Sequence, residues 1–268
     1  MTQTEGVDQM ARSRRTIGLA AGAVVMLGAA VFAGWWFLVR DDAPPEADIE
    51  AAGETLDEAT TPGSGSASSD GSTDGSTDGS TGDAAVDGTW TVDQSVGSFA
   101  DFTSTWAGYR FDEELVSIGT NTAVGRTPDV IGTMTVAGDE VTAVDVEVDV
   151  TTLDSDSDRR DGALRTRGLE SDRFPTATFR LTEPVALAAG LADGERATLS
   201  AMGELTIHGV TNETTIELQA ELQGDAAVVV GSAPVALADH GIDPPTGLSV
   251  LSIAEDGTFE FQLFFSRG

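Results

Sequence analysis

The stretch Gly203–Leu218, GELTIHGVTNETTIEL, decides the fold class of this chain. In its first half, Leu205 and Ile207 alternate with polar residues, and the alternation resumes after a Gly- and Asn-containing turn at 209–212. A period of two on both sides of such a turn is typical of a β-hairpin. Because one face is apolar and the other carries Thr, Glu and His, the stretch predicts an antiparallel sheet with one buried side.

Further strand patterns occur throughout residues 88–268. The predicted strands are Thr89–Asp93, Gly97–Ala107, Val130–Val136, Glu140–Val150, Ala177–Leu181, Ala197–His208, Thr214–Leu222, Ala226–Ala238 and Thr258–Phe265. One short helix is predicted at the charged segment Asp158–Thr166. Regularly spaced strands with polar outer faces indicate an all-β sandwich or a closed barrel, and periodicity does not choose between them.

The predicted hairpin and two further motifs resemble the YceI-like family of secreted, lipocalin-like barrels. GTWTVD at Gly88–Asp93 is similar to the opening strand of that family. The family's R-D-x-x-L…F-P-x-x-x-F signature is matched by Arg160, Asp161, Leu164, Phe174, Pro175 and Phe179. This resemblance extends from about Gly88 to Arg267, and it implies an antiparallel lipocalin-like β-barrel of about eight strands with one short helix.

Apolar residues expected to face the barrel interior are the candidate ligand-binding residues. They are Phe102, Trp106, Val146, Val148, Phe179, Leu205, Phe259 and Phe261. In one interpretation they form a packed core, and in the other they line a cavity, because about eight strands can close around one small or elongated ligand. The resemblance favours the cavity, since barrels of that family enclose a long isoprenoid or acyl chain.

The charged helix supplies candidates for contact with a lipid headgroup. Arg159 and Arg160 precede Asp161 there. One interpretation is an ion-pair network that holds the helix to the barrel. In the other, an arginine faces the mouth of the pocket and binds a headgroup through charge-assisted hydrogen bonds.

Residues 1–40 predict a membrane anchor. The segment 17–39 carries no charged side chain, and its length corresponds to about 35 Å of helix, enough to cross a bilayer. Arginines precede this segment, so the positive-inside rule places the rest of the chain outside the cytoplasm. A cleaved signal peptide is the alternative, because Ser13–Leu19 resembles a twin-arginine export signal. The protein is thus expected in the cell membrane as a single-pass protein, or secreted after cleavage.

Residues 41–87 predict a disordered spacer. They are rich in Asp, Glu, Ala and Pro, and the tetrapeptide D-G-S-T repeats from Asp70 to Thr81. So few apolar residues cannot offset the entropy of ordering the chain. The aspartate spacing fits neither an EF-hand nor the nonapeptide calcium repeat. The chain is therefore expected to comprise an anchor at 1–40, a spacer at 41–87 and a barrel domain at 88–268.

Charge and motifs argue against several classes of function. A net charge of −31 disfavours a nucleic-acid partner. The chain has no cysteine, and His208 and His240 lack metal-site spacing. Asp154, Asp156 and Asp158 begin like a calcium loop, but arginines follow where its glycine and last carboxylate should stand. Nucleophile elbow, phosphate loop and dinucleotide fingerprint are all missing from the sequence, so no metal, cofactor or catalytic constellation is predicted.

These observations predict a membrane-tethered carrier that binds or sequesters a polyisoprenoid or another long-chain lipid and is not an enzyme. The alternative is an adhesion or scaffold barrel with a packed interior, whose outer surface makes the functional contacts. An enzyme is the third hypothesis, and no motif favours it. The volume of the barrel interior distinguishes the first two hypotheses.

Overall fold

A computed structural model describes residues 43–61, 86–116, 119–187, 194–244 and 250–268 of the protein. The strands are β1 (Gly88–Asp93), β2 (Trp106–Leu115), β3 (Gly119–Thr127), β4 (Val130–Ala137), β5 (Glu140–Asp149), β6 (Asp154–Ser155), β7 (Thr176–Leu181), β8 (Val185–Ala186), β9 (Ala197–Ile207), β10 (Val210–Gln223), β11 (Ala226–Ala236), β12 (Val250–Ile253) and β13 (Asp256–Arg267). The helical elements within these ranges are α2 (Ile49–Thr60), α3 (Asp158–Thr166) and the short 3-10 helices η1 (Phe99–Asp101), η2 (Val150–Thr152) and η4 (Leu237–His240).

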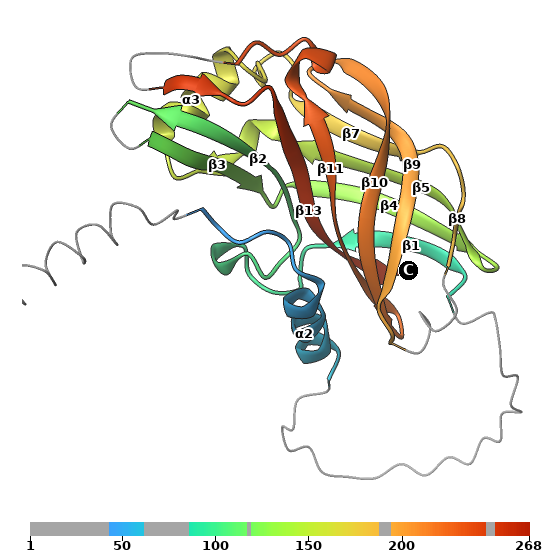
Figure 1. The fold of residues 1–268 in the computed structure, drawn as a ribbon. Helices are drawn as coiled ribbons and strands as arrows, with labels where there is room; N and C mark the ends of the chain where they lie inside the picture. Colours follow the sequence, from blue (N-terminus) through green and yellow to red (C-terminus); the bar gives the residue numbers. More distant parts are fainter. Residues whose placement is uncertain (1–42, 62–85, 117–118, 188–193, 245–249) are drawn as a thin grey trace, which may run out of the picture. The chain divides into compact units, whose positions relative to one another are not determined.

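Eight antiparallel strands close into a barrel (Figure 1). Their order is β1–β4–β5–β7–β9–β10–β11–β13, and β13 pairs back with β1. The predicted all-β barrel is confirmed. The helix predicted at Asp158–Thr166 is confirmed as α3. Within the described ranges no helix is both long and apolar enough to span a bilayer, and the anchor predicted at 17–39 lies outside those ranges.

One end of the barrel is widened because β13 has two neighbours along a single edge. Its residues 264–267 pair with β1, whereas its residues 258–262 pair with β2. From β2 the sheet continues through β3 to β6, next to which α3 lies (Figure 1). The sheet therefore opens away from the closed circuit at this end.

The hairpin predicted from Gly203–Leu218 is confirmed, with a tighter turn than expected. Ile207 pairs with Val210, so the connection consists of two residues, His208 and Gly209. Their φ angles are 54° and 73°, the left-handed conformation that a two-residue hairpin turn of the primed type requires. The alternation on both strands follows the prediction, with Leu205 directed into the barrel.

The strand predicted at Gly97–Ala107 is wrong over most of its length. Side chains compete with strand hydrogen bonding there, since Ser98 accepts from the amide of Ala100 and Asp101 accepts from that of Thr103. The chain therefore forms η1, and β2 begins only at Trp106.

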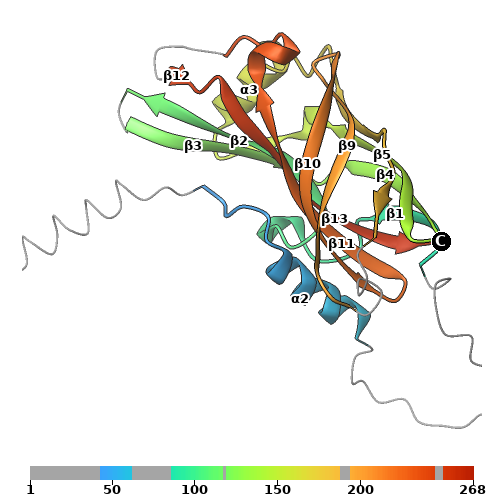
Figure 2. The same ribbon diagram turned by 45° about the vertical axis from the view of Figure 1, so that its right-hand side comes forward.

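The spacer predicted at 41–87 is wrong for residues 49–60, which form α2. The side chain of Asp48 caps the helix by accepting hydrogen bonds from the amides of Glu50 and Ala51. One face of α2, formed by Ile49, Ala52 and Leu56, packs against Val228, Val230 and Phe264 on the outer wall of the barrel (Figure 2). In the sequence, an Asp at the N-cap position followed by apolar residues at helical spacing indicates this helix. The D-G-S-T repeat lies outside the described residues.

Candidate ligand-binding site

The interior of the closed barrel holds an apolar cavity of about 170 Å³, here called the inner chamber. Its lining is apolar except for Thr178, Glu221 and Glu260. The two carboxylates are paired with arginines: Glu221 with Arg196 and Glu260 with Arg126. The inner chamber thus presents almost nothing but hydrocarbon to a ligand.

A second cavity of about 760 Å³, here called the outer chamber, lies at the widened end of the barrel. Its floor is apolar, with Tyr109, Phe111 and Ile207 among its lining residues, and α3 contributes Leu164. Its rim is charged and includes the exposed side chain of Arg159. The outer chamber therefore opens to solvent beside α3.

Phe259 lines both chambers, so the two cavities meet at its ring. An engineered apolar cavity of about 150 Å³ accommodates benzene, so the inner chamber alone has room for only a few carbon atoms. A chain that enters the inner chamber and is longer than this must extend into the outer chamber.

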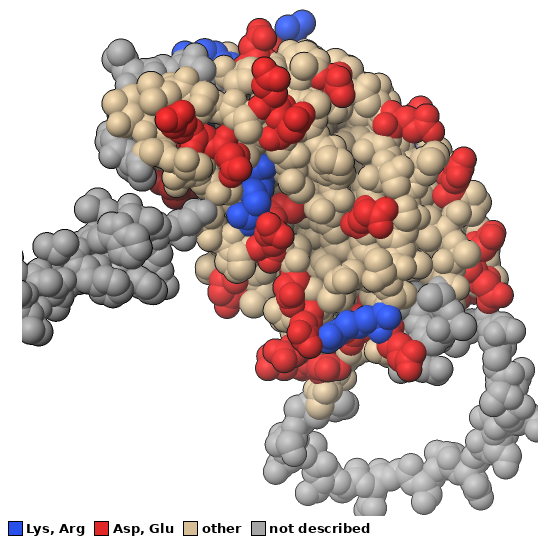
Figure 3. All heavy atoms as spheres, viewed as in Figure 1, with Lys and Arg blue, Asp and Glu red and all other residues tan. Residues whose placement is uncertain are grey.

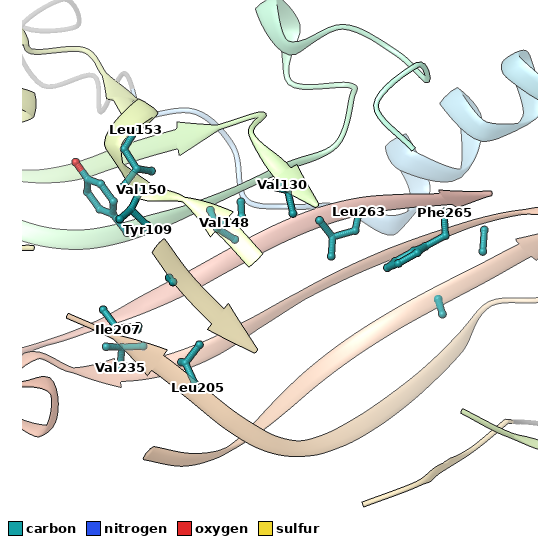
Figure 4. Packing of buried hydrophobic residues seen from close by; sticks show 14 of the residues in the cluster. Tyr109, Val130, Val148, Val150, Leu153, Leu205, Ile207, Val235, Leu263 and Phe265 are labelled. Atoms are coloured by element: carbon teal, nitrogen blue, oxygen red, sulfur yellow. The ribbon is translucent and has the colours of Figure 1, made fainter. Parts of the chain in front are cut away.

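Most of the ligand-binding residues predicted from the sequence line these chambers. The residues found in the inner chamber are Val146, Val148, Phe179, Leu205, Phe259 and Phe261. Arg159 and Arg160 line the outer chamber. Figure 4 shows Val148, Leu205 and Leu263 along the barrel, with Tyr109 near the end away from Phe265.

Phe102 and Trp106 line neither chamber, so their assignment to the pocket is wrong. On β2 the residues that line the chambers are Ala107, Tyr109 and Phe111, and successive side chains of a strand point to opposite faces. Trp106 therefore faces away from the cavity, where it packs against a buried arginine.

That arginine, Arg126, forms a polar cluster on the outer wall. Its guanidinium carbon lies 3.7 Å from the ring centroid of Trp106 and 4.7 Å from that of Phe102. Its side chain is only 2% exposed and pairs with Glu260 at 2.8 Å. Burial lowers the pKa of Arg126, and the hydrogen bond and charge of Glu260 oppose this effect. Arg126 also donates to the carbonyl of Pro45, which ties the segment before α2 to the barrel.

At the rim of the outer chamber, Arg160 is held by two carboxylates. It pairs with Glu113 at 2.6 Å and with Asp156. Burial acts to lower the pKa of Arg160, but these two acidic partners outweigh it and raise that pKa. Arg159 makes no ion pair with any described residue. The predicted ion-pair network therefore exists around Arg160. Arg159 and Arg167, which also lines the outer chamber and is exposed, are rim cations without an ion pair to a described residue.

Tyr109 is a chamber residue that the sequence analysis missed. Its side chain is 6% exposed, and its hydroxyl oxygen has no hydrogen-bond partner among the described residues. Burial raises the pKa of Tyr109; Arg160 opposes this shift, while Asp161 and Glu113 reinforce it. Alternation of Tyr109 and Phe111 with polar residues on β2 would have revealed its inward direction.

Titratable groups in the described ranges do not cluster as a metal site would require. His208 is engaged elsewhere: its Nε2 lies 2.8 Å from a carboxylate oxygen of Glu170, and its Nδ1 lies 3.0 Å from the carbonyl of His240. On the face drawn in Figure 3, acidic side chains are widely scattered and basic ones form only a few small groups. The chemistry of this site is therefore that of apolar burial with a polar rim.

The sequence is similar to a protein family and to several known proteins. A profile of the YceI-like domain family matches residues 90–265. A UPF0312 protein of Vibrio parahaemolyticus is 34% identical over 106 residues, which are 37% of this chain and 52% of that protein. For a UPF0312 protein of Vibrio vulnificus the identity is 35% over 113 residues, 40% of this chain and 56% of the relative. The chain thus spans about half the length of the curated relatives it matches.

Two solved structures are similar at low identity. A polyisoprenoid binding domain from Saccharophagus degradans has 18% identity and a TM-score of 0.49, covering 67% of this chain and 98% of that one. Burkholderia cenocepacia BcnA has 15% identity and a TM-score of 0.47, covering 59% of this chain and 95% of that one.

Proposed function

The chain belongs to the YceI-like domain family, and on that premise we propose that it is a non-enzymatic carrier that binds or sequesters one long-chain lipid, a polyisoprenoid or a long acyl chain. The observation that carries this proposal is the pair of chambers that meet at Phe259, one almost wholly apolar and the other open at a charged rim. The tail of the lipid occupies the inner chamber, and its head lies in the outer chamber.

Apolar burial is sufficient to hold such a ligand. Each methylene removed from water contributes about 0.8 kcal/mol, so ten methylenes contribute about 8 kcal/mol. Ordering the chain and restricting its motion takes back several kcal/mol. The remainder of about 4 kcal/mol corresponds to a millimolar Kd, and about five further methylenes buried in the two chambers bring the Kd to about micromolar. Two arginines lie at the rim beside the head: Arg159, which pairs with no described residue, and Arg160, which is held by its acidic partners.

The proposal also covers the location of the protein in the cell. The uncharged segment 17–39 and the arginines before it support a membrane anchor that leaves the barrel outside the cytoplasm. Alkaline carbonate extraction of membranes from cells that express the full chain tests this part: the protein should remain in the membrane pellet. Release into the supernatant would show a cleaved or peripheral protein instead.

Native mass spectrometry of the purified full chain in mild detergent tests the carrier function. A co-purified lipid of discrete mass at one equivalent per chain is the expected result. The scaffold alternative requires a barrel that stays empty after incubation with long-chain lipids. That result would overturn the carrier proposal, because the apolar chambers are its only support in the structure.

A further inference from the structure

The ring of Tyr109 lines the outer chamber together with Phe111 and Phe259, and its buried hydroxyl is a donor without a partner among the described residues. A buried polar group without a partner costs free energy relative to a paired one. The same ring without the oxygen would fill this position without that cost, so the hydroxyl calls for a partner that the described residues do not supply.

The polar groups around Tyr109 are already paired with each other. Glu113 accepts from Arg160 at 2.6 Å and from Asn121 at 2.9 Å, and Asp161 accepts from the hydroxyl of Ser155 at 2.6 Å. None of these described groups bonds to the Tyr109 hydroxyl, so its donor is open to a group that enters the outer chamber.

We propose that Tyr109 is the residue that positions the lipid head, by donating a hydrogen bond to an uncharged oxygen acceptor, such as a carbonyl, that lies next to the chain in the outer chamber. This inference rests on the carrier function proposed above and adds the chemistry of the head. It makes Tyr109 a specificity-determining residue for a lipid that combines a long apolar chain with a neutral acceptor.

The charges that face Tyr109 explain why the acceptor is uncharged. Glu113, Asp156 and Asp161 all lie close enough to act on the phenol, and Arg160 is the one cation among the groups that do so. Arg160 is itself neutralised by its pairs with Glu113 and Asp156. An anion at this depth would be desolvated beside carboxylates, which is costly without a free cation. A carbonyl oxygen accepts the same hydrogen bond without that cost.

The test uses the full-length protein in detergent, stripped of lipid and then offered an equimolar mixture of methyl hexadecanoate and heptadecane. Native mass spectrometry reads the ratio of the two complexes. One hydrogen bond contributes a net factor of about three to ten, so the wild type should favour the ester by about that factor. Tyr109→Phe should bind both lipids with nearly equal occupancy. The double variant Tyr109→Phe/Phe111→Tyr, which keeps the composition and moves the hydroxyl, should not restore the preference.

A direct measurement follows the hydroxyl itself. Tyr109 is the only tyrosine of the chain, so incorporation of 3-fluorotyrosine yields one fluorine resonance. That resonance should shift when the ester is added and should stay in place, or move less, with heptadecane.

Each of the other outcomes contradicts either the carrier function or the role of Tyr109. If the wild type takes up neither lipid, the carrier function fails and this inference fails with it. If it takes up both equally, the carrier function stands and Tyr109 is not its polar anchor. If Tyr109→Phe keeps the wild-type preference, the ester is recognised elsewhere. If hexadecanoate outcompetes the ester equally in wild type and Tyr109→Phe, the rim arginines hold an anionic head and the inference is overturned.

Discussion

Tyr109 of β2 lies over Gly125 of β3, its partner in the strand register. A Cβ atom built on Gly125 would come within 2.4 Å of Cε1 of Tyr109 and 2.7 Å of its hydroxyl oxygen. Glycine in a strand often marks such a close approach. The missing side chain of Gly125 thus gives the tyrosine ring its place in the outer chamber.

Gly125→Ala should therefore destabilise the protein. The added methyl group must displace the ring or the strand, and overpacking of this kind costs about 1–3 kcal/mol. Urea unfolding followed by circular dichroism measures the change. Gly162→Ala is the matched control, because its Cβ would meet nothing within 4 Å. Since Gly162 lies in α3, that change should stabilise by up to about 1 kcal/mol. Equal effects of the two substitutions would contradict the contact.

The phenol of Tyr109 should resist ionisation in the folded protein, because burial raises its pKa. Because the folded-state pKa is raised, the phenol's contribution to stability is fully present below the unfolded-state pKa of about 10. It is lost as the pH rises above that value towards the folded-state pKa. Ultraviolet difference spectroscopy of this single tyrosine should show tyrosinate only as the far-ultraviolet circular dichroism signal is lost.

Tyr109→Phe should lose less stability above pH 10 than the wild type, since it has no phenol to ionise. Tyrosinate that forms at its ordinary pKa while the circular dichroism signal is intact would show that the hydroxyl is accessible to solvent.

Val148→Trp should block the inner chamber. Val148 is 8% exposed and lines the cavity, so a larger ring there occupies the space of the lipid tail. Lipid occupancy in native mass spectrometry should fall to background while the thermal midpoint changes little. Glu147→Trp is the control, because this neighbour faces outwards and is exposed. If the interior were packed, Val148→Trp would instead destabilise the fold by about 1–3 kcal/mol with no lipid to lose.

Leu56→Ala should reveal that α2 is part of the barrel domain. Leu56 is 0% exposed and packs with Phe264 and Val228 on the outer wall. Truncation of a buried leucine costs about 2–5 kcal/mol. Glu58→Ala, on the exposed side of the same helix, should change the free energy of unfolding by less than about 0.5 kcal/mol.

A protein that begins at residue 88 provides a second measurement of the same contact. It should unfold at lower denaturant than one that begins at residue 43, because the apolar patch under α2 is then exposed to water. Equal midpoints for the two proteins would place the domain boundary at residue 88, as the sequence predicted.

Arg126→Ala should destabilise the protein by about 3–5 kcal/mol, because it leaves Glu260 buried without its closest partner. The side chains of this pair are 2% and 3% exposed. Arg180→Ala is the control: its pair with Asp145 is 71% and 55% exposed, and exposed pairs contribute about 1 kcal/mol or less. Similar losses in chemical unfolding would contradict the burial of the outer-wall cluster.

Within the barrel, local patterns were reliable guides. The alternation of Val144, Val146 and Val148 on one strand, and that of Leu205 on the hairpin, predicted the inward residues because side-chain direction in a strand has a period of two wherever the strand pairs. Phe102 and Trp106 were misplaced because a few local side-chain hydrogen bonds replaced the expected strand with η1. The inward face of β2 is marked by Tyr109 and Phe111, which lie beyond the end of the predicted strand at Ala107.

The sequence by itself determined most strands of the closed barrel, the charged helix α3 and the polarity of the barrel wall, since each depends on the residues of a single segment; β3 and most of β2 were not predicted. Only the tertiary structure decided that α2 packs on the outer wall, that the interior is divided into two chambers at Phe259, and that Tyr109 lies unpaired in one of them. These features depend on contacts between strands and helices that are distant in the chain. Their energies arise from close packing and from desolvation, and neither is encoded in the periodicity of any one segment.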